Sequence, residues 1–283
     1  MAFVDQNHII LIEGAPVERF ATETLLRDDL GLDPVFVQLW HSEHGIDMRF
    51  SAHTHFVSIG LAIGTKECPA PDCGRSWIKT LQPIVLAEWP RAGGNETGSL
   101  TTVGNWRGYG SIEFRGQQYG QKAHSLRKLI ELPLRTTEIF ELALAIHPAE
   151  TADLAALTKN GWRILDPLSV AGTPAEYRRF IQGSKAEFGV AKSGYALSQC
   201  GWFSDRSVCY LASGRPVLAQ DTGFAKWIPT GEGLLAFETV DDVLGGIETM
   251  NGNYPRHAAA ARDIAENYFD ANKVLPRLLE EVA

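Results

Sequence analysis

The regular alternation of apolar, strand-like runs with helical segments after residue 98 is the strongest constraint on how this chain can fold. The run IFELALAI (139–146) is almost continuously apolar, which is typical of a strand covered on both faces. Strands that alternate with helices form parallel βαβ units with right-handed crossovers. The pattern therefore predicts an α/β fold with a Rossmann-type, doubly wound parallel sheet. We expect its strands at 99–106, 139–146, 162–165, 187–192, 215–220 and 233–238, and its helices at 120–131, 149–159, 173–181, 204–213, from Thr239 onward, 255–267 and 272–282.

Residues before position 90 are less regular. We expect a helix from Pro16 to about Leu30, because proline suits a first helical turn. PRAGGNETG (90–98) has one proline, three glycines and no apolar periodicity, which indicates a linker. The sequence therefore predicts a smaller, partial N-terminal α/β domain (1–92), a linker (93–98) and a C-terminal domain (99–283). Strands of the first domain are expected at 9–14, 35–40, 55–64 and 83–90.

Composition excludes several classes of protein. Lysine and arginine total 26 against 34 aspartates and glutamates, a formal charge of −8. We expect no nucleic-acid partner, because neutralising phosphates needs clustered cations. No apolar run approaches the roughly 20 residues that span a bilayer, and the first residues show no basic leader with a cleavage site. These features predict a cytoplasmic protein without a transmembrane segment.

Candidate metal ligands are sparse. The four cysteines lack the spacing of a zinc site and are expected to be thiols. His53 and His55 lie two residues apart on one side of an extended segment. They can serve as metal ligands with a third group, as a base, or as polar loop residues. We expect no metal.

Ligands of doubly wound sheets bind at the carboxyl ends of the strands, in loops that lead into helices. GNWRGYGS (104–111) follows the first strand of the C-terminal domain, where Asn105, Trp106 and Arg107 can meet a diphosphate. The alternative is a glycine-rich hairpin whose Trp106 packs on the linker. Because the segment is not a GxGxxG fingerprint, a nicotinamide-dependent oxidoreductase loses its main support.

Two further loops are candidates at the same edge. His147 follows the strand 139–146, where it can contact a ligand or serve as an ordinary, hydrogen-bonded loop residue. In LDPLSVAG (165–172), backbone groups can hydrogen-bond a flat base, with Leu168 or Val170 against its face. An ordinary connection has the same composition.

The segment 190–224 is the most informative of the four. Ser204, Asp205 and Arg206 open a predicted helix, whose unpaired N–H groups and dipole favour an anion. Ser204 and Asp205 are also explained as an ordinary cap and a first-turn acid. Arg206 is not, because a cation near a helix N-terminus is unfavourable without an anionic partner. Lys192 ends the preceding strand, so we expect it at the same phosphate or sugar contact.

The stretch YLASGRPVLAQDTG (210–223) resembles the helix–Gly–x–Pro–Val–strand signature of GT-B-fold glycosyltransferases, and looks closest to bacterial group-1-like members with their CgeB-like relatives. The resemblance covers residues 99–283. It implies metal-independent transfer of a sugar from a nucleotide-diphosphate donor, which is a co-substrate and not a cofactor, to a sugar, lipid, protein or small-molecule acceptor. Lys192 and Arg206 are then expected to be catalytic, because they stabilise the departing diphosphate. The expected substrate contacts are Asn105, Trp106, Arg107, His147, Leu168, Val170, Ser204, Asp205 and Gly223.

Two departures from this family leave a second interpretation open. Many members carry the acidic pair E-x7-E, whose second glutamate holds the ribose, whereas this chain has Gly201 and Cys209 there. GT-B enzymes also need two comparable domains, and the first one here is short. Asp205 and Arg206 can take over the ribose and sugar contacts. Otherwise the chain is a sugar-nucleotide-binding or protein-interaction relative that has lost turnover. The donor base, the sugar, the acceptor and the stereochemical outcome stay open.

Overall fold

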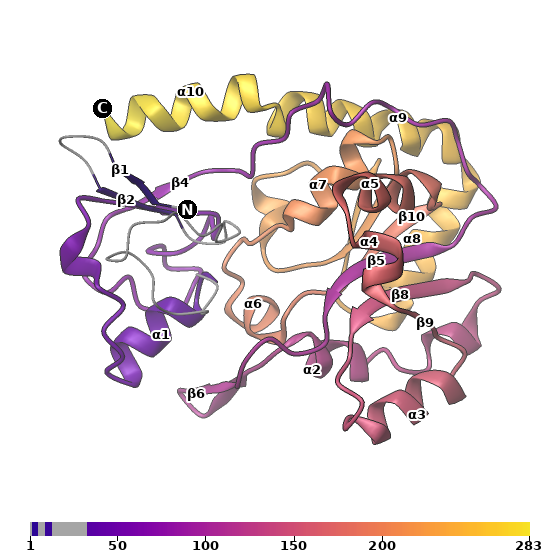
Figure 1. The fold of residues 1–283 in the computed structure, drawn as a ribbon, viewed down its shortest axis with the longest axis horizontal. Helices are drawn as coiled ribbons and strands as arrows, with labels where there is room; N and C mark the ends of the chain where they lie inside the picture. The colour runs from indigo at the N-terminus through magenta and orange to yellow at the C-terminus, as the bar shows by residue number, and fades with distance from the viewer. Residues whose placement is uncertain (1, 5–8, 13–32) are drawn as a thin grey trace.

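A computed structural model gives the fold and describes residues 2–4, 9–12 and 33–283 (Figure 1). The strands are β1 (Ala2–Val4), β2 (Ile9–Ile12), β3 (His55–Ser58), β4 (Trp77–Lys79), β5 (Leu100–Asn105), β6 (Ile112–Phe114), β7 (Gln117–Tyr119), β8 (Phe140–Ala145), β9 (Arg163–Leu165), β10 (Ala186–Gly189), β11 (Val217–Gln220) and β12 (Leu234–Phe237). The α-helices are α1 (Phe36–Glu43), α2 (Lys122–Arg127), α3 (Thr151–Lys159), α4 (Pro167–Ala171), α5 (Pro174–Gly183), α6 (Ser193–Ser198), α7 (Asp205–Ala212), α8 (Val240–Gly252), α9 (Tyr254–Ile264) and α10 (Ala271–Val282). Single helical turns lie at Phe50–Ala52, Leu132–Arg135, Phe224–Lys226 and Ala265–Phe269.

Six parallel strands form the main sheet, in the order β12-β11-β10-β5-β8-β9. β5 comes first along the chain yet lies in the middle, between β8 and β10. One half of the sheet is therefore built outward through β8 and β9, and the other half through β10, β11 and β12. This is the doubly wound order, in which a ligand crevice forms where the order reverses, at the carboxyl ends of β5 and β10. The predicted fold class is confirmed, and every strand predicted between residues 99 and 238 has an observed counterpart.

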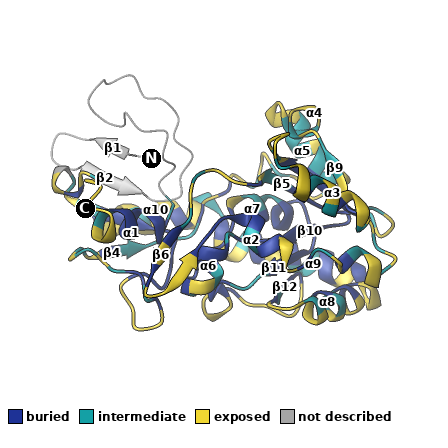
Figure 2. Cartoon of the chain, turned by 90° about the horizontal axis from the view of Figure 1, so that it is seen from below, coloured by how far each residue is buried: buried dark blue, intermediate teal, exposed yellow. Residues whose placement is uncertain are grey.

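Apolar side chains on both faces hold this sheet. On β10, the ring of Phe188 lies 5.1 Å from that of Phe140 and 5.6 Å from that of Phe237, between centroids. Successive residues of a strand point to opposite faces, so the neighbouring Glu187 points toward the other face. The helices α2, α3 and α8 bury residues in the core cluster that contains Phe188. The helices α5 and α7 bury residues in a second core cluster, which contains Val217 of β11. Figure 2 shows these buried residues gathered through the middle of the domain, with exposed residues outside them.

A second sheet has the order β1-β2-β3-β4, with β1 antiparallel to β2 and the other pairs parallel. Phe50, Phe56 and Trp77 pack beside it, with ring centroids 5.5–6.0 Å apart. Residues 35–40 were predicted as a strand, and this was wrong because a short apolar run does not distinguish a buried strand from a buried helix. They form the start of α1, whose buried residues are Phe36, Val37, Gln38, Leu39 and Trp40.

Other parts of the sequence prediction differ from the structure or lie outside the described residues. The strand predicted at 83–90 was wrong, because this segment makes only an isolated bridge between Ile84 and Asp270 and buries Ile84 in the core of the C-terminal domain. The hairpin β6–β7 and the short helices α4 and α6 were not predicted. The helix predicted at 16–30 lies outside the described residues.

The chain crosses between the two sheets twice. Residues 81–89 already pack on the C-terminal domain, which is earlier than the predicted linker. At the other end, α10 runs back along the top of the view in Figure 1, and Val282 packs against Val57 of the first sheet, with Ile78 beside them. The last helix thus joins the first sheet, although the sequence suggested a continuous unit over 99–283. Like every other helix in the described part of the chain, α10 lacks the length and apolarity needed to span a bilayer.

Candidate functional site

The candidate site lies at the carboxyl edge of the main sheet, where β5 and β10 end side by side. Gly104 and Asn105 close β5, and α2 begins with Lys122. Backbone contacts hold the start of α2 against the loop after β10: Gly194 N donates to Gly120 O at 3.0 Å, and Gly120 N donates to Ser193 Oγ at 3.0 Å. Three parts of the chain that are distant in sequence, the end of β5, the start of α2 and the loop after β10, therefore lie together at the switch point of the sheet.

Arg206, in the first turn of α7, lies beneath this edge. Its Nε donates to Glu187 Oε1 at 2.6 Å, and Nη1 donates to the carbonyl of Val103 at 2.9 Å. Burial alone would lower the pKa of Arg206, but Glu187, Tyr177 and Asp205 together outweigh burial and raise this pKa above its usual value. A Cβ atom on Gly104 would lie 3.7 Å from Arg206 Nη1 and 3.5 Å from Lys122 Nζ. The two cations thus lie along the same side of the end of β5.

Lys122 is a buried cation at this edge, with 8% of its surface exposed. Its ammonium makes no hydrogen bond or ion pair to any of residues 33–283, although the carboxylates of Glu187 and Asp205 act on it from a greater distance. Burial disfavours the ammonium and the neighbouring Arg206 repels it, so the pKa of Lys122 lies well below its usual value. A buried charge without a counter-ion is costly. The site is therefore suited to an anionic ligand.

Lys192, just after β10, is held in a polar and aromatic cage. Its ammonium forms an ion pair with Asp33 Oδ2 and donates to the phenol oxygen of Tyr109 at 2.8 Å. It also lies 4.4 Å from the ring centroid of Tyr109 and 5.6 Å from those of Phe36 and Tyr195. Burial lowers the pKa of Lys192, and the Asp33 carboxylate opposes this effect. Lys192 and Arg206 both act electrostatically on Lys122, so the two cations expected from the sequence both lie near this lysine.

Ser204 and Asp205 flank Arg206 as the sequence suggested. Ser204 is 4% exposed and lines a narrow cavity beside Arg206. It occupies the N-cap position without making a capping hydrogen bond; its hydroxyl contacts Asp205 Oδ1 at 3.4 Å. Gly223 has φ +90°, and a Cβ there would lie 2.8 Å from the carbonyl oxygen of Gln199. Backbone geometry therefore explains the glycine at this position.

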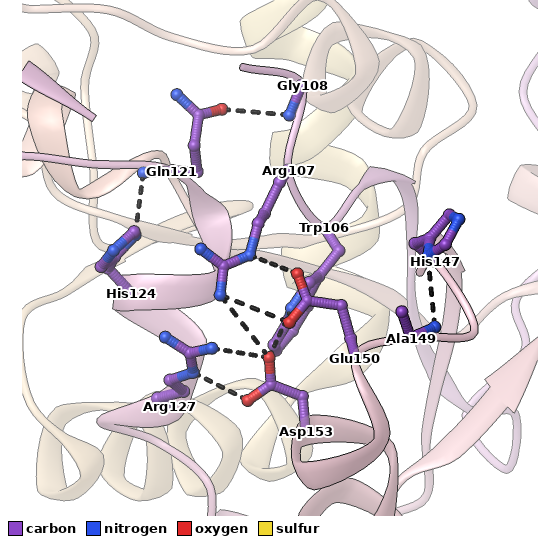
Figure 3. A network of polar contacts seen from close by, with 10 residues as sticks. All are labelled: Trp106, Arg107, Gly108, Gln121, His124, Arg127, His147, Ala149, Glu150 and Asp153. Atoms are coloured by element: carbon purple, nitrogen blue, oxygen red, sulfur yellow. Dashed lines mark hydrogen bonds and ion pairs between the residues drawn. The ribbon is translucent and has the colours of Figure 1, made fainter. Parts of the chain in front are cut away.

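The loop after β5 has a structural role in part (Figure 3). Trp106 is 1% exposed, and its Nε1 donates to Asp153 Oδ2 at 2.8 Å. Arg107 pairs with Glu150 at 2.6 Å. Arg127, on α2, also donates to Asp153. The two acids at the start of α3, Glu150 and Asp153, therefore anchor the loop to that helix. Trp106 belongs to the core, and Arg107 already has an acidic partner.

His147 lies on the other side of Glu150 in Figure 3, away from Arg107 and Arg127. Its Nδ1 accepts a hydrogen bond from Ala149 N at 3.2 Å. Both histidines of the first domain have local contacts as well: His53 Nδ1 lies 3.0 Å from Arg49 O, and His55 Nδ1 lies 3.0 Å from Thr54 Oγ1. No cluster of three His, Cys, Asp or Glu side chains suited to a metal ion occurs among the described residues.

A cleft of about 690 Å³ lies next to the cations, at the ends of β5, β8 and β9. This size is within the range of small-molecule sites. Leu168 lines the cleft, as the base-binding interpretation requires, whereas Val170 is not among the described lining residues. The lining is mostly apolar and comprises Val103, Gly104, Asn105, Leu144, Ala145, Ile146, Leu154, Ile164, Leu165, Asp166, Pro167, Leu168 and Ala171.

Several residues of the site were not found from the sequence. Lys122 shares one signal with Arg206, because both are cations in the first turn of a helix. Glu187 was visible as a lone charge in an apolar strand. Nothing local marked Asp33 or Tyr109. Cys209, at the place of the family's ribose-binding glutamate, lies on α7, where burial raises the pKa of its thiol to about 12 and keeps it neutral.

Comparison with known proteins supports the fold. No family model matches the chain, and no curated protein matches it in sequence. An α-glucosyltransferase solved with UDP-glucose and DNA containing an abasic site is similar over 82% of this chain and 66% of that one, with TM-score 0.55 and 11% identity. An α-glucosyltransferase solved with UDP matches over 84% and 68%, with TM-score 0.54 and 10% identity. Sucrose-phosphate synthase of Thermosynechococcus elongatus matches over 76% and 55%, with TM-score 0.50 and 11% identity.

The chain has the GT-B fold. Its six-stranded parallel sheet agrees with this assignment. The chain spans 55–68% of the length of these GT-B structures.

Proposed function

We propose that the chain is a glycosyltransferase that takes a sugar from a nucleoside-diphosphate donor. The observation that carries the proposal is the meeting of Lys122, Lys192 and Arg206 at the switch point of a GT-B sheet, with Lys122 buried and lacking an anionic partner in the described residues. A diphosphate supplies that partner. Two structures with this fold were solved in complex with UDP-glucose or UDP, which supports a donor of this class.

In this proposal the cations act on the leaving group. The negative charge on the diphosphate grows as the bond to the sugar breaks, and fixed cations in a site shielded from water stabilise it most at that moment. Arg206 is held in place by Glu187, so it needs no rearrangement during the reaction. Because these side chains supply the positive charge that a divalent ion supplies elsewhere, we expect no metal requirement.

The adjacent cleft is proposed to hold the base of the donor. Leu168 then lies against the flat ring, and Asn105 and the carbonyl groups of the lining offer hydrogen-bond partners. The acceptor is proposed to enter from the side of the first sheet. The expected partners are therefore a nucleotide sugar and an acceptor. The net charge of −8 argues against non-specific nucleic-acid binding.

A second candidate function is binding of a nucleotide sugar without turnover. Two observations favour it: the neutral thiol of Cys209 replaces the family's ribose-binding glutamate, and the ammonium of Lys192 already has a carboxylate partner. Both candidates require donor binding. Consumption of the donor, by transfer or by hydrolysis, separates them.

The test is titration of the full chain with UDP, ADP and GDP by calorimetry, together with thermal melting. A ligand present at 100 times its Kd stabilises the folded state by about 2.7 kcal/mol. Lys122→Met is expected to abolish binding, whereas Lys128→Met, at an exposed lysine of the same segment, keeps it. If millimolar concentrations of all three nucleotides leave heat and melting temperature unchanged, the proposed function is wrong.

A further inference from the structure

A carboxylate from the first part of the chain occupies a receptor built by the second part. Asp33 lies just before α1. Its Oδ1 accepts a hydrogen bond from the phenol of Tyr195 at 2.6 Å, and its Oδ2 accepts one from the phenol of Tyr109 at 2.6 Å. Oδ2 also pairs with the ammonium of Lys192. One cation and two hydroxyl groups thus converge on both oxygens of a single carboxylate.

This receptor has the chemistry of an oxyanion site. Charge-assisted hydrogen bonds from ammonium groups and hydroxyls are the contacts that bind carboxylates and phosphates most strongly. Tyr195 is 1% exposed, so its position is fixed by packing. Burial raises the pKa of both phenols, and the nearby Asp33 carboxylate adds to this effect, so both stay protonated as donors. Asp33 contributes only the anion.

The charges at the edge of the sheet indicate a role for the Asp33 carboxylate. Glu187 neutralises Arg206, and Asp33 neutralises Lys192, which leaves Lys122 as the cation without a partner among the described residues. A diphosphate carries at least two negative charges near neutral pH. To engage Lys192 as well as Lys122, it must take the place of Asp33, because two anions at one ammonium repel each other.

We propose that Asp33 is an internal competitor for a phosphate group: it fills the receptor of Lys192, Tyr109 and Tyr195 in the free protein, and a nucleoside diphosphate displaces it. The two phenols then donate to a phosphate oxygen instead of the carboxylate. This inference rests on the proposed function and adds two ligand-binding tyrosines and a competing group to it.

Displacement of Asp33 would change more than the receptor. The carbonyl of Asp33 accepts the hydrogen bond of Val37 N at 3.1 Å, so this residue begins the first turn of α1. Phe36, the first residue of α1, packs edge-on against Tyr109 and Tyr195, with ring centroids 5.0 and 5.8 Å away. Release of the carboxylate therefore loosens α1 from the C-terminal domain. Donor binding is coupled in this way to the part of the chain that faces the acceptor.

The experiment titrates inorganic pyrophosphate into the full chain by calorimetry, because this probe tests the receptor whatever the base of the natural ligand. Asp33→Asn keeps the shape of the side chain and removes its charge. We expect this variant to bind pyrophosphate about 5- to 150-fold more tightly than the unmodified chain, the usual size of a coupling between two ligands. Glu43→Gln removes the same charge from an exposed position on α1 and is expected to leave the affinity unchanged.

Two outcomes overturn the inference. If Asp33→Asn and the unmodified chain bind pyrophosphate equally while UDP, ADP or GDP binds to both, Asp33 does not compete and the proposed function stands. If neither protein binds pyrophosphate or any of the nucleotides, both proposals fall. If Asp33→Asn and Glu43→Gln raise the affinity for pyrophosphate by the same factor, the effect comes from long-range charge and the inference is also overturned.

A second measurement needs no variant. Hydrogen exchange of the unmodified chain is followed with and without saturating pyrophosphate. Displacement removes the side-chain contacts that tie Asp33 to the C-terminal domain, and the backbone carbonyl of the same residue accepts the hydrogen bond of Val37 N. We therefore expect faster exchange at the amides of the first turn of α1, near Val37. Unchanged or slower exchange there, in a sample that binds pyrophosphate, contradicts the inference even if Asp33→Asn does not fold.

Discussion

Arg206 Nε lies 2.6 Å from Glu187 Oε1, and this ion pair joins α7 to β10. The Glu187 side chain is fully buried, and that of Arg206 is 12% exposed. The other carboxylate oxygen, Glu187 Oε2, has no hydrogen-bond partner within the described residues. A carboxylate this costly to bury in a parallel strand is explained by the guanidinium that it fixes at the end of β5. The pair therefore belongs to the architecture of the anion site.

Replacing Glu187 tests this relationship. Glu187→Leu leaves the buried guanidinium without its counter-ion, and breaking a buried pair in this way costs about 3–5 kcal/mol of unfolding free energy. The control is Glu232→Leu, which breaks the exposed pair between Glu232 and Arg256 and is expected to cost less than about 1 kcal/mol. Urea denaturation measures both. Equal losses for the two variants would show that the buried pair does not hold Arg206.

Lys122 is expected to show opposite effects on stability and on binding. Lys122→Met removes a buried, repelled ammonium and keeps most of the volume of the side chain. We expect the free energy of unfolding to rise by about 0.5–2 kcal/mol, as is common when a functional site is replaced by a well-packed apolar residue. Binding of UDP, ADP or GDP is expected to disappear in the same variant. A loss of stability in urea denaturation would instead mark Lys122 as a structural residue.

The same lysine gives a prediction for pH. Its pKa in the folded chain lies below its usual value of 10.5, so between these two pKa values the unfolded chain binds more protons. The free energy of unfolding is therefore expected to rise with pH across that window, relative to Lys122→Met. The groups that act on Lys122 are the cations Arg206 and Lys192 and the carboxylates of Glu187 and Asp205.

A bound anion reverses this preference, because it favours the ammonium. Pyrophosphate binding above the lowered pKa is expected to take up about one proton, and the affinity is expected to fall as the pH rises. Calorimetry in two buffers with different ionisation enthalpies measures the uptake. Proton uptake that persists in a pyrophosphate-binding Lys122→Arg variant, whose guanidinium does not titrate, would assign it to another group.

Much of the main sheet was predictable because its helices carry clear local signals. Threonine is a common N-cap residue, and the Thr239 side chain accepts a hydrogen bond from Asp242 N at 3.2 Å at the start of α8. Glycine is common just after a helix, and Gly214, which follows α7, has φ +68°, a conformation that glycine adopts at little cost. Such signals depend on neighbours in sequence, so they need no knowledge of the fold.

The remainder depended on contacts between distant segments. The run at 35–40 is helical because it buries all sides between the first sheet and the aromatic rings near Tyr109, which periodicity alone does not reveal. Lys122 is separated from β5 by the hairpin β6–β7, so spacing does not link them. Asp33 and Lys192 lie 159 residues apart in sequence, so no local pattern connects them. The cations on loops of one sheet could be proposed from the sequence, whereas their carboxylate partners could not.

The cleft at the ends of β5, β8 and β9 supports a prediction that separates recognition of the base from recognition of the phosphates. Ala171→Phe places a ring in a cleft of about 690 Å³ and is expected to weaken binding of the preferred nucleoside diphosphate at least tenfold, about 1.4 kcal/mol. Pyrophosphate does not reach the cleft, so its affinity is expected to stay unchanged. Ala152→Phe, on the exposed side of α3, is the matched control for an added aromatic ring. Because the cations and the cleft are adjacent but distinct, equal losses for nucleotide and pyrophosphate in Ala171→Phe would mean that the variant disturbs the cation site and that the base does not lie in the cleft.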